Sequence, residues 1–372
     1  MTFEGEADLL RLGARTDAAT FLRRIKQAAL GALESDLSDE ALKAGPDDYI
    51  LRANAIALGV ADAGAPEIAD QIYTELLTRV DRQKTEAGDR RHRGALLANR
   101  AWMNVMLRRY DIAIPFMQYV VLVEDPETYG VAPEDSFGNT IRRSQLDDPA
   151  IDVLSNVLSG VALHVDRKIS RLELESCFSF LGESVHVLYG VILELKHNID
   201  FALKASLGSS YTALRLFDAF RSYAFFLEEL VGRLAVIEAG RRKLSEPSHF
   251  SGIELRQGLA YLFGRAGEER SWWSRLQAEL KETRDRCRNK PVDVQNARLE
   301  ELAERVPTSA EDTLVTSIGV LYVVRNLGAH EIYPPAYLVA PEIHLERVLA
   351  WLTTSAVLIQ REYITPDGAS VP

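Results

Sequence analysis

The sequence predicts an all-α protein, and three observations support this fold class. Nearly every apolar run places its apolar residues three and four positions apart, which is the period of a helix with one buried face. No stretch alternates apolar and polar residues between the dipeptides Asn-Gly or Asp-Gly that mark hairpins. Alanine, leucine, arginine and glutamate, which cost least in a helix, fill the segments between helix breakers.

Two helix pairs are predicted in the first third of the chain. In each pair, two alanines lie 12 positions apart on either side of a turn. The pairs are Ala57 with Ala69 around residues 64–66, and Ala101 with Ala113 around residues 109–111. Small side chains let the two helices of a pair approach closely near their turn.

This spacing, followed by Pro126 after the second pair, resembles the pattern of tetratricopeptide repeats. The resemblance implies that residues 1–135 form a helical platform that binds a protein partner or regulator. Two copies are fewer than the roughly three that a free-standing array of such repeats needs, so ordinary helical hairpins are an equal alternative.

A domain boundary is predicted between residues 135 and 136. Residues 128–150 hold Gly, Pro, Ser and Asp without an apolar period, which is typical of a linker. Amphipathic helices are predicted after it, at residues 149–166, 171–206, 209–243, 252–264, 269–288, 309–331 and 341–362. We therefore expect a second, helical domain at residues 136–372.

The composition restricts the class of protein. The chain has 372 residues, of which 47% are hydrophobic and 26% charged, so it can bury a large core and is not dominated by disorder. Cys177 and Cys287 stand far apart without a Cys-x-x-Cys pair, which excludes a zinc ribbon or a disulfide scaffold and favours a reducing compartment.

The acidic first residues do not resemble a signal peptide, and the most apolar run, residues 112–123, is shorter than the ~20 residues that cross a bilayer. A cytoplasmic protein without membrane contact is expected.

The net charge of −11 limits how the chain can bind nucleic acid. Phosphate binding depends on clustered lysine and arginine, so broad non-specific attraction to nucleic acid is not expected. Any RNA site must therefore rest on local clusters of basic residues. One such cluster is the segment from Glu254 to Lys290, which has 9 Lys and Arg against 6 Asp and Glu.

The basic residues at the end of this segment are candidate RNA contacts. They are Arg284, Arg286, Arg288 and Lys290, and Trp272 and Trp273 precede them. Basic side chains together with aromatic ones suit single-stranded RNA, because bases stack on the rings and phosphates bind the cations. A solvated helix face with two core tryptophans is the alternative.

Familiar catalytic motifs do not occur. The sequence has no GxxxxGK[ST], no GxGxxG after a strand, no HExxH and no GxSxG, so glycine-cradled nucleotides and serine hydrolysis lack support. Glu183-x-x-His186 and Glu194-x-x-His197 resemble half-sites of di-iron bundles, but they lie ~16 Å apart along one helix and no matching helices supply partners. Neither a metal nor a cofactor is expected.

The segment from Ser309 to Tyr333 is the most informative stretch. Ser309 followed by Asp312 resembles a capping box and starts a helix that runs to Arg325. Four residues, the first of which is Asn326, separate this arginine from His330. The pattern R-x4-H, with a polar residue after the arginine, resembles the signature of the HEPN superfamily of helical ribonucleases.

The resemblance implies a four-helix bundle that forms a homodimer and joins two copies of the motif in one cleft. It also implies that Arg325, Asn326 and His330 are the catalytic residues. Some branches of the family have a tyrosine two positions after the histidine, whereas here Tyr333 comes one residue later and stays outside the expected site.

The same residues suit RNA cleavage on chemical grounds. Without a metal, cleavage needs a base for the 2′-hydroxyl proton, an acid for the 5′-oxygen and a cation for the charge that develops on the phosphate. Histidine titrates near neutral pH, and arginine presents a planar fork to phosphate oxygens. In a regular helix Arg325 and His330 point about 140° apart, so a break at Gly328 or a second copy of the chain must bring the groups together. In the alternative, Arg325 lies along the surface and His330 caps a helix end.

We therefore expect a metal-independent endoribonuclease that cleaves RNA by attack of the 2′-hydroxyl and resembles toxins or antiviral-defence effectors. Its N-terminal helices would regulate it or recognise a partner. The alternative is a non-catalytic helical scaffold that binds protein through the N-terminal helices and keeps the C-terminal bundle for dimerisation.

Overall fold

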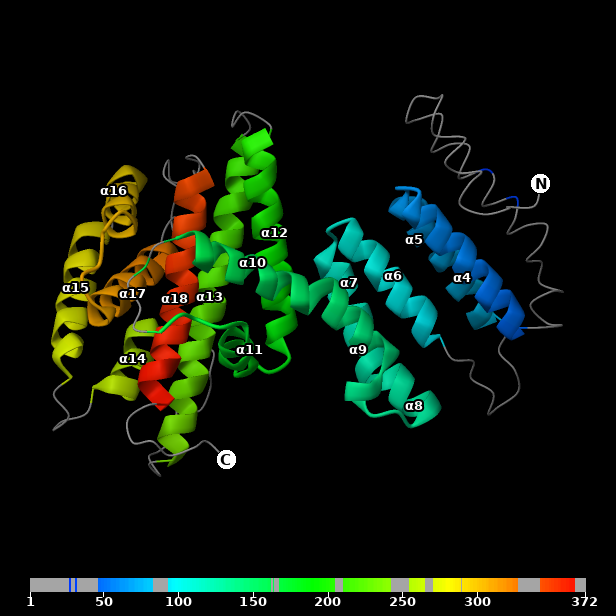
Figure 1. Cartoon of the computed structure of the whole chain (residues 1–372), viewed down its shortest axis with the longest axis horizontal. Coiled ribbons are helices and arrows are strands. Elements are labelled where there is room, and N and C mark those ends of the chain that lie inside the picture. The colour runs from blue at the N-terminus through cyan, green and yellow to red at the C-terminus, as the bar shows by residue number, and fades with distance from the viewer. Residues whose placement is uncertain are drawn as a thin grey trace. The chain divides into compact units, whose positions relative to one another are not determined.

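The computed structural model describes two helical units (Figure 1). The described residues are 46–82, 93–161, 163, 167–204, 210–241, 254–264, 270–288, 290–326 and 342–364, together with 27 and 31. Every element among them is a helix and none is a strand, which confirms the all-α class. No helix in this part of the chain is long and apolar enough to span a bilayer.

Residues 1–148 form the first compact unit. Its first four described helices are α4 (Pro46–Asp62), α5 (Pro66–Arg82), α6 (Gly94–Met106) and α7 (Tyr110–Tyr119). Each of these helices packs against the next one in the sequence. The alanines of the two predicted pairs, Ala57, Ala69, Ala101 and Ala113, are all fully buried. The helical hairpins predicted at these alanines are therefore present.

Local sequence explains the turns of these hairpins. Gly64 has a φ of +84°, in the left-handed region that disfavours a side chain. Pro66 then begins α5, where its missing N–H has no intrahelical partner to lose. In the second hairpin Arg108 takes the left-handed conformation, with a φ of +60°. The sequence predicts a turn at this place but not that an arginine takes the strained position.

The linker predicted at residues 128–150 is wrong, because most of the segment is helical. After α7 come a π-helix (Val120–Glu124), α8 (Asp125–Tyr129), a 3-10 helix (Pro133–Asp135), α9 (Phe137–Arg142), a second π-helix (Arg143–Asp147) and α10 (Asp148–Gly160). The Ser136 hydroxyl donates a 2.5 Å hydrogen bond to Oδ2 of buried Asp125. α9 packs on α6 and α7, so the units divide at residues 148 and 149, beyond the predicted 135 and 136.

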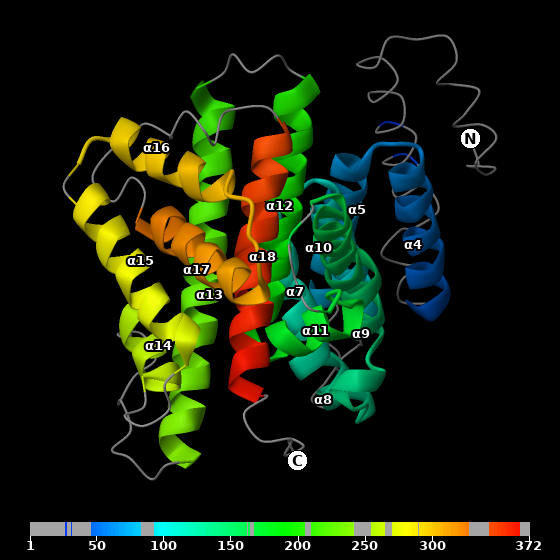
Figure 2. The ribbon, with the colours of Figure 1, turned by 60° about the vertical axis from the view of Figure 1, so that its left-hand side comes forward.

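Residues 149–372 form the second unit. Its described helices after α10 are α11 (Arg171–Ser179), α12 (Ser184–Lys204), α13 (Ser210–Arg241), α14 (Leu255–Phe263), α15 (Ser271–Cys287), α16 (Val292–Ala303), α17 (Ala310–Asn326) and α18 (Glu342–Ile364). Figure 2 shows α12, α13 and α18 as long neighbouring helices, with α14 to α17 gathered on one side of them. α17 contacts α13, α15, α16 and α18, so it links the two groups of helices.

α17 and α18 form the centre of the second unit. Every residue of α17 from Thr313 to Leu321 is buried, and α18 is buried from Val348 to Gln360. The indole N–H of Trp351 donates a hydrogen bond to the Ala303 carbonyl at 2.9 Å, which joins α18 to α16. α17 is therefore packed firmly between its neighbouring helices, and this packing positions its last turn.

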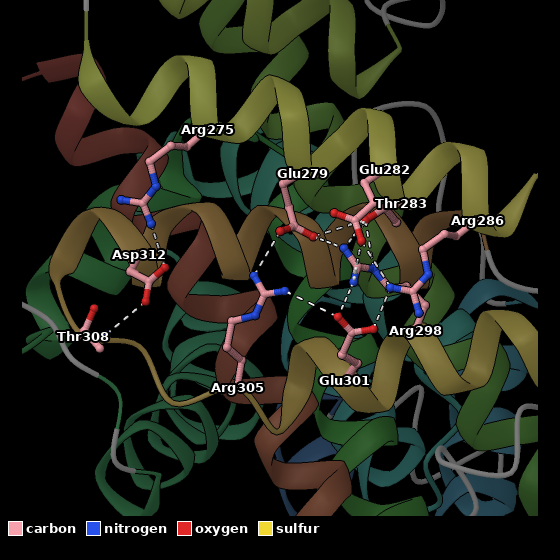
Figure 3. Close-up of polar contacts among 10 residues, drawn as sticks. All are labelled: Arg275, Glu279, Glu282, Thr283, Arg286, Arg298, Glu301, Arg305, Thr308 and Asp312. Atoms are coloured by element: carbon pink, nitrogen blue, oxygen red, sulfur yellow. Dashed lines mark hydrogen bonds and ion pairs between the residues drawn. The ribbon is translucent and has the colours of Figure 1, made fainter.

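The predicted N-terminal cap of α17 is present. Ser309 Oγ accepts a hydrogen bond from the Asp312 N–H at 3.1 Å. Asp312 Oδ2 accepts one from the Thr308 N–H at 3.0 Å, and Figure 3 shows this second contact. Asp312 also binds Arg275 of α15 at 2.8 Å. The cap therefore fixes the first turns of α15 and α17 against each other.

Two features of this unit differ from the sequence prediction. Residues 171–206 were expected to form one helix, but α11 and α12 are separate because Gly182 adopts a φ of +57° between them. α16 was not predicted, although Pro291 directly before it is a common residue at a helix start.

Candidate functional site

Arg325 and Asn326 lie together in the last turn of α17. Arg325 Nη1 donates a hydrogen bond to Asn326 Oδ1 at 2.9 Å, and Asn326 Nδ2 donates one to the Tyr322 carbonyl at 2.7 Å. The structure thus joins two of the three predicted catalytic side chains. The third, His330, lies outside the described residues, as does Gly328.

Glu228 of α13 sets the direction of the Arg325 side chain. Glu228 Oε2 accepts a hydrogen bond from Arg325 Nε at 2.9 Å, and Oε1 accepts one from the backbone N–H of Leu255, the first residue of α14, at 2.8 Å. The Glu228 side chain is 12% exposed and the Arg325 side chain is 32% exposed. One carboxylate therefore connects three helices and leaves the arginine partly accessible to solvent.

Two further arginines lie near this turn of α17. α15 and α17 start together, so Arg284, near the end of α15, lies close to Tyr322 near the end of α17. Arg256, in the first turn of α14, is also close to Tyr322. Burial and the negative charge of Glu254 raise the pKa of the Tyr322 hydroxyl, while the positive charges of Arg256, Arg284 and Arg325 oppose the rise. Tyr322 is therefore a protonated hydrogen-bond donor near three cations and one carboxylate, and this excess of positive charge suits an anionic ligand.

Of the predicted RNA contacts at the end of α15, Arg284 is partly exposed, and Arg288 and Lys290 are exposed. Arg284 contacts its sequence neighbour Asp285 at 3.2 Å, and that aspartate is itself exposed. Arg288 and Lys290 follow the last turn of α15 and are exposed as well. Exposed pairs of this kind are held weakly, so these three cations are accessible to a phosphate.

Arg286 behaves differently, because it belongs to an ion-pair network between α15 and α16 (Figure 3). Its guanidinium lies 3.2 Å from Glu282 and 2.8 Å from Glu301. Two carboxylates thus pair with this side chain, although it is 44% exposed. As an RNA contact Arg286 stays a prediction, and a phosphate bound there would compete with Glu282 and Glu301.

Arg298 of α16 is the centre of the network, and sequence reasoning missed it. Its side chain is 1% exposed, and it binds Glu279 as well as Glu301 Oε1 at 2.5 Å and the Thr283 hydroxyl at 3.2 Å. Burial disfavours the charge of Glu301, yet hydrogen bonds and positive charge, first from Arg298, hold the pKa of this carboxyl below its usual value. The network fixes α15 against α16 and so positions the end of α15.

The aromatic partners predicted for the basic residues lie elsewhere. Trp272 is 4% exposed and packs edge-on against Phe263, with 5.0 Å between the ring centroids, and Trp273 is 6.4 Å from the same ring. Both tryptophans belong to the first turn of α15, on the order of 18 Å along the helix from Arg284. The tryptophans therefore do not lie next to Arg284, whereas Arg270 of the same basic segment lies 5.9 Å from the Trp272 ring centroid.

No group of three or more His, Cys, Asp or Glu side chains among the described residues is arranged to hold a metal ion. In the two Glu-x-x-His segments, His186 is buried against Tyr189, and Glu194 lies 3.5 Å from Arg215. Cys177 is fully buried, and burial raises the pKa of its thiol, so this thiol stays protonated and unreactive.

Comparison with protein-family models, with curated proteins and with solved structures finds no match to this chain.

Proposed function

We propose that the protein is a metal-independent endoribonuclease whose site includes Arg325, Asn326 and His330. The observation that supports this proposal most is the oriented, partly exposed guanidinium of Arg325. Its Nε and Nη1 donate hydrogen bonds to Glu228 and Asn326. These bonds fix the plane of the guanidinium group, and the side chain remains 32% exposed. A pre-positioned arginine stabilises the charge of a phosphate transition state at little entropic cost.

Nearby charge also supports RNA as the substrate. Arg256 and Arg284 approach Tyr322 from α14 and α15, so cations from three helices lie around the last turns of α17. A local cluster of this kind attracts an RNA backbone despite the acidic overall charge. Arg288 and Lys290 extend the same basic segment beyond α15.

In the proposed reaction, the 2′-oxygen attacks the adjacent phosphorus and the bond from phosphorus to the 5′-oxygen breaks. A base removes the 2′-hydroxyl proton and an acid protonates the departing 5′-oxygen. The products are a 2′,3′-cyclic phosphate and a 5′-hydroxyl. We assign the proton transfers to His330 and the stabilisation of phosphate charge to Arg325. A homodimer would supply one imidazole for each side of the phosphate.

The first unit, with its two helical hairpins, would then regulate the nuclease or recognise a protein partner, as in a toxin or an antiviral-defence effector. Tetratricopeptide-like packing of these hairpins is part of this proposal. The buried alanines at the hairpin turns are compatible with it, and they are equally compatible with ordinary helical hairpins.

The test is cleavage of a fluorescent single-stranded RNA by purified variants. Arg325→Ala and His330→Ala are each expected to lower the cleavage rate by about 100-fold or more, because each removes a group that acts in the transition state. Arg275→Ala is the matched control, since Arg275 is an exposed arginine paired with Asp312 at the other end of α17. Wild-type rates in both site variants would contradict the proposed site.

Mixing the two inactive variants tests the dimer. If two chains share one cleft, some mixed dimers keep one intact set of groups, so activity should return in part when Arg325→Ala and His330→Ala chains are combined. Sedimentation at micromolar concentration should show a dimer. A fully active monomer would contradict the shared cleft.

A second candidate function is the non-catalytic scaffold, and one contact favours it. Glu228 binds both Arg325 and the first N–H of α14, so the Arg325 side chain also has a structural role. If Arg325 only joins helices, Arg325→Ala will lower the melting temperature and the wild-type protein will cleave no RNA. The cleavage assay therefore separates the two functions.

A further inference from the structure

Phe225 of α13 is an exposed aromatic ring with two arginine guanidiniums close to it. Phe225 is a large apolar residue, yet it is 41% exposed to solvent. The guanidinium carbon of Arg221 lies 5.3 Å from the ring centroid, and that of Arg325 lies 5.9 Å from it. Both distances fall within the range of cation–π contacts.

This arrangement is not explained by packing in the core. An exposed phenylalanine gains little from burial, whereas the neighbouring Leu227 and Leu230 of α13 are at most 1% exposed. Arg221 has no hydrogen bond or ion pair with any described residue, and its Nε–H is buried without a partner. Arg221, which pairs with no carboxylate among the described residues, therefore lies beside a partly exposed aromatic ring, and this combination suits a ligand that brings both a flat ring and a negative charge.

Phe225 is also close to the proposed cleavage site, because Arg325 contacts Glu228 on the next turn of α13 and contacts the Phe225 ring as well. Arg221 and Phe225 are four positions apart and therefore share one face of the helix. A nucleotide bound on this face would place its phosphate within reach of Arg325.

We propose that Phe225 stacks on an unpaired base of the RNA substrate while Arg221 and Arg325 bind phosphates next to that base. The proposal rests on the proposed function and names its substrate class, which is single-stranded RNA. A base inside a duplex is stacked between its neighbours and offers no free face, so interior base pairs cannot use Phe225. An unpaired base can, and stacking on an aromatic side chain tolerates any sequence.

The test is binding of a labelled single-stranded RNA whose 2′-hydroxyls are methylated, so that it cannot be cleaved. Phe225→Ala should weaken binding by about 10-fold or more, as expected for the loss of one stacked base. Phe225→Tyr keeps the ring and should bind within about twofold of wild type, whereas Phe225→Leu keeps apolar surface without a π face and should resemble the alanine variant. The matched control is Phe137→Ala, since Phe137 is a similarly exposed phenylalanine, 45% accessible, of the first unit. Equal affinities for Phe225→Ala, Phe137→Ala and wild type would overturn the proposal.

A double-mutant comparison shows whether Phe225 binds RNA itself or only supports Arg325. If Phe225 stacks on a base, Phe225→Ala should still weaken binding when Arg325 is already alanine. If its effect disappears in that background, Phe225 acts through Arg325 and the stacking proposal is wrong.

Failure of this inference is distinguishable from failure of the proposed function. Abolished cleavage in Arg325→Ala together with unchanged RNA affinity in Phe225→Ala would leave the nuclease standing and remove Phe225 from its site. RNA binding that depends on Phe225, without any cleavage by wild type, would instead support an RNA-binding protein and remove the catalytic proposal.

Discussion

Replacing Arg298 by methionine should destabilise the second unit strongly. The side chain is 1% exposed and binds Glu279, Glu301 and the Thr283 hydroxyl. Methionine fills a similar volume, so Arg298→Met removes charge and hydrogen bonds without opening a large cavity. What remains is a group of carboxylates whose main buried cation is gone.

The expected magnitude follows from the exposure of those carboxylates. Removing one partner of a buried ion pair costs about 3–5 kcal/mol, because the other charge stays buried. Glu279 is 11% exposed but keeps Arg305 at 3.0 Å, whereas Glu301 is 43% exposed and can be hydrated. The loss should therefore fall at the lower end, about 3 kcal/mol.

Thermal unfolding followed by circular dichroism measures this loss. For a unit of this size, about 3 kcal/mol corresponds to a fall of ~6–12 °C in melting temperature. The control is Arg275→Met, which breaks a pair whose arginine is 48% exposed and should cost no more than about 1 kcal/mol. High salt should shrink the effect of the control more than that of Arg298→Met. Equal losses for the two variants would refute the assignment of Arg298 as the centre of the network.

Two further predictions concern other contacts. Glu173 accepts hydrogen bonds from Arg361 Nε at 2.6 Å and Nη2 at 2.9 Å, and this pairing holds its pKa below the usual range. Because the native pKa lies below the unfolded one, the pair stabilises the fold above about pH 4.3, and this contribution is lost as pH falls through the native pKa. Glu173→Gln should therefore lower the melting temperature at pH 7 and much less in acid; equal shifts at both pH values would count against the pairing. In the first unit, a Cβ on Gly138 would lie 2.6 Å from Val120 Cγ1, so Gly138→Ala should cost about 1–3 kcal/mol in urea unfolding, and an unchanged midpoint would show that Val120 can move.

Local signals made much of the fold predictable from the sequence. The alanine pairs and the turn at Gly64 located two hairpins, and Ser309 with Asp312 located the start of α17. Each of these signals acts between residues close in sequence, where helical period and capping chemistry are reliable. The split between α11 and α12 also has a local cause, Gly182, but glycine within a helical pattern is common enough that its left-handed conformation was not evident.

The linker prediction failed because turn-forming residues were given too much weight. Gly130 does end α8 in a left-handed conformation, and Pro133 does begin a short 3-10 helix. The residues after them nevertheless return to helix, since Gly138 allows α9 to approach Val120 closely. Tertiary packing of this kind overrides local propensity.

The site depends on contacts between distant residues, which explains what sequence reasoning missed. Glu228 and Arg325 are 97 positions apart, and only the fold shows that they bind each other. The same holds for Arg286, whose partner Glu301 comes from a helix that was not predicted. Phe225 carried a weak signal, because Arg221 lies four positions before it, but that spacing is common on helices.

The measurement that tests the central claim most directly is cleavage of single-stranded RNA by the wild-type protein in excess EDTA, with analysis of the product ends. The account predicts that cleavage persists and that the products carry 2′,3′-cyclic phosphates and 5′-hydroxyls, because the 2′-oxygen is the nucleophile and Arg325 supplies the positive charge. Loss of cleavage in EDTA with recovery on addition of Mg²⁺, or products with 5′-phosphates, would contradict it.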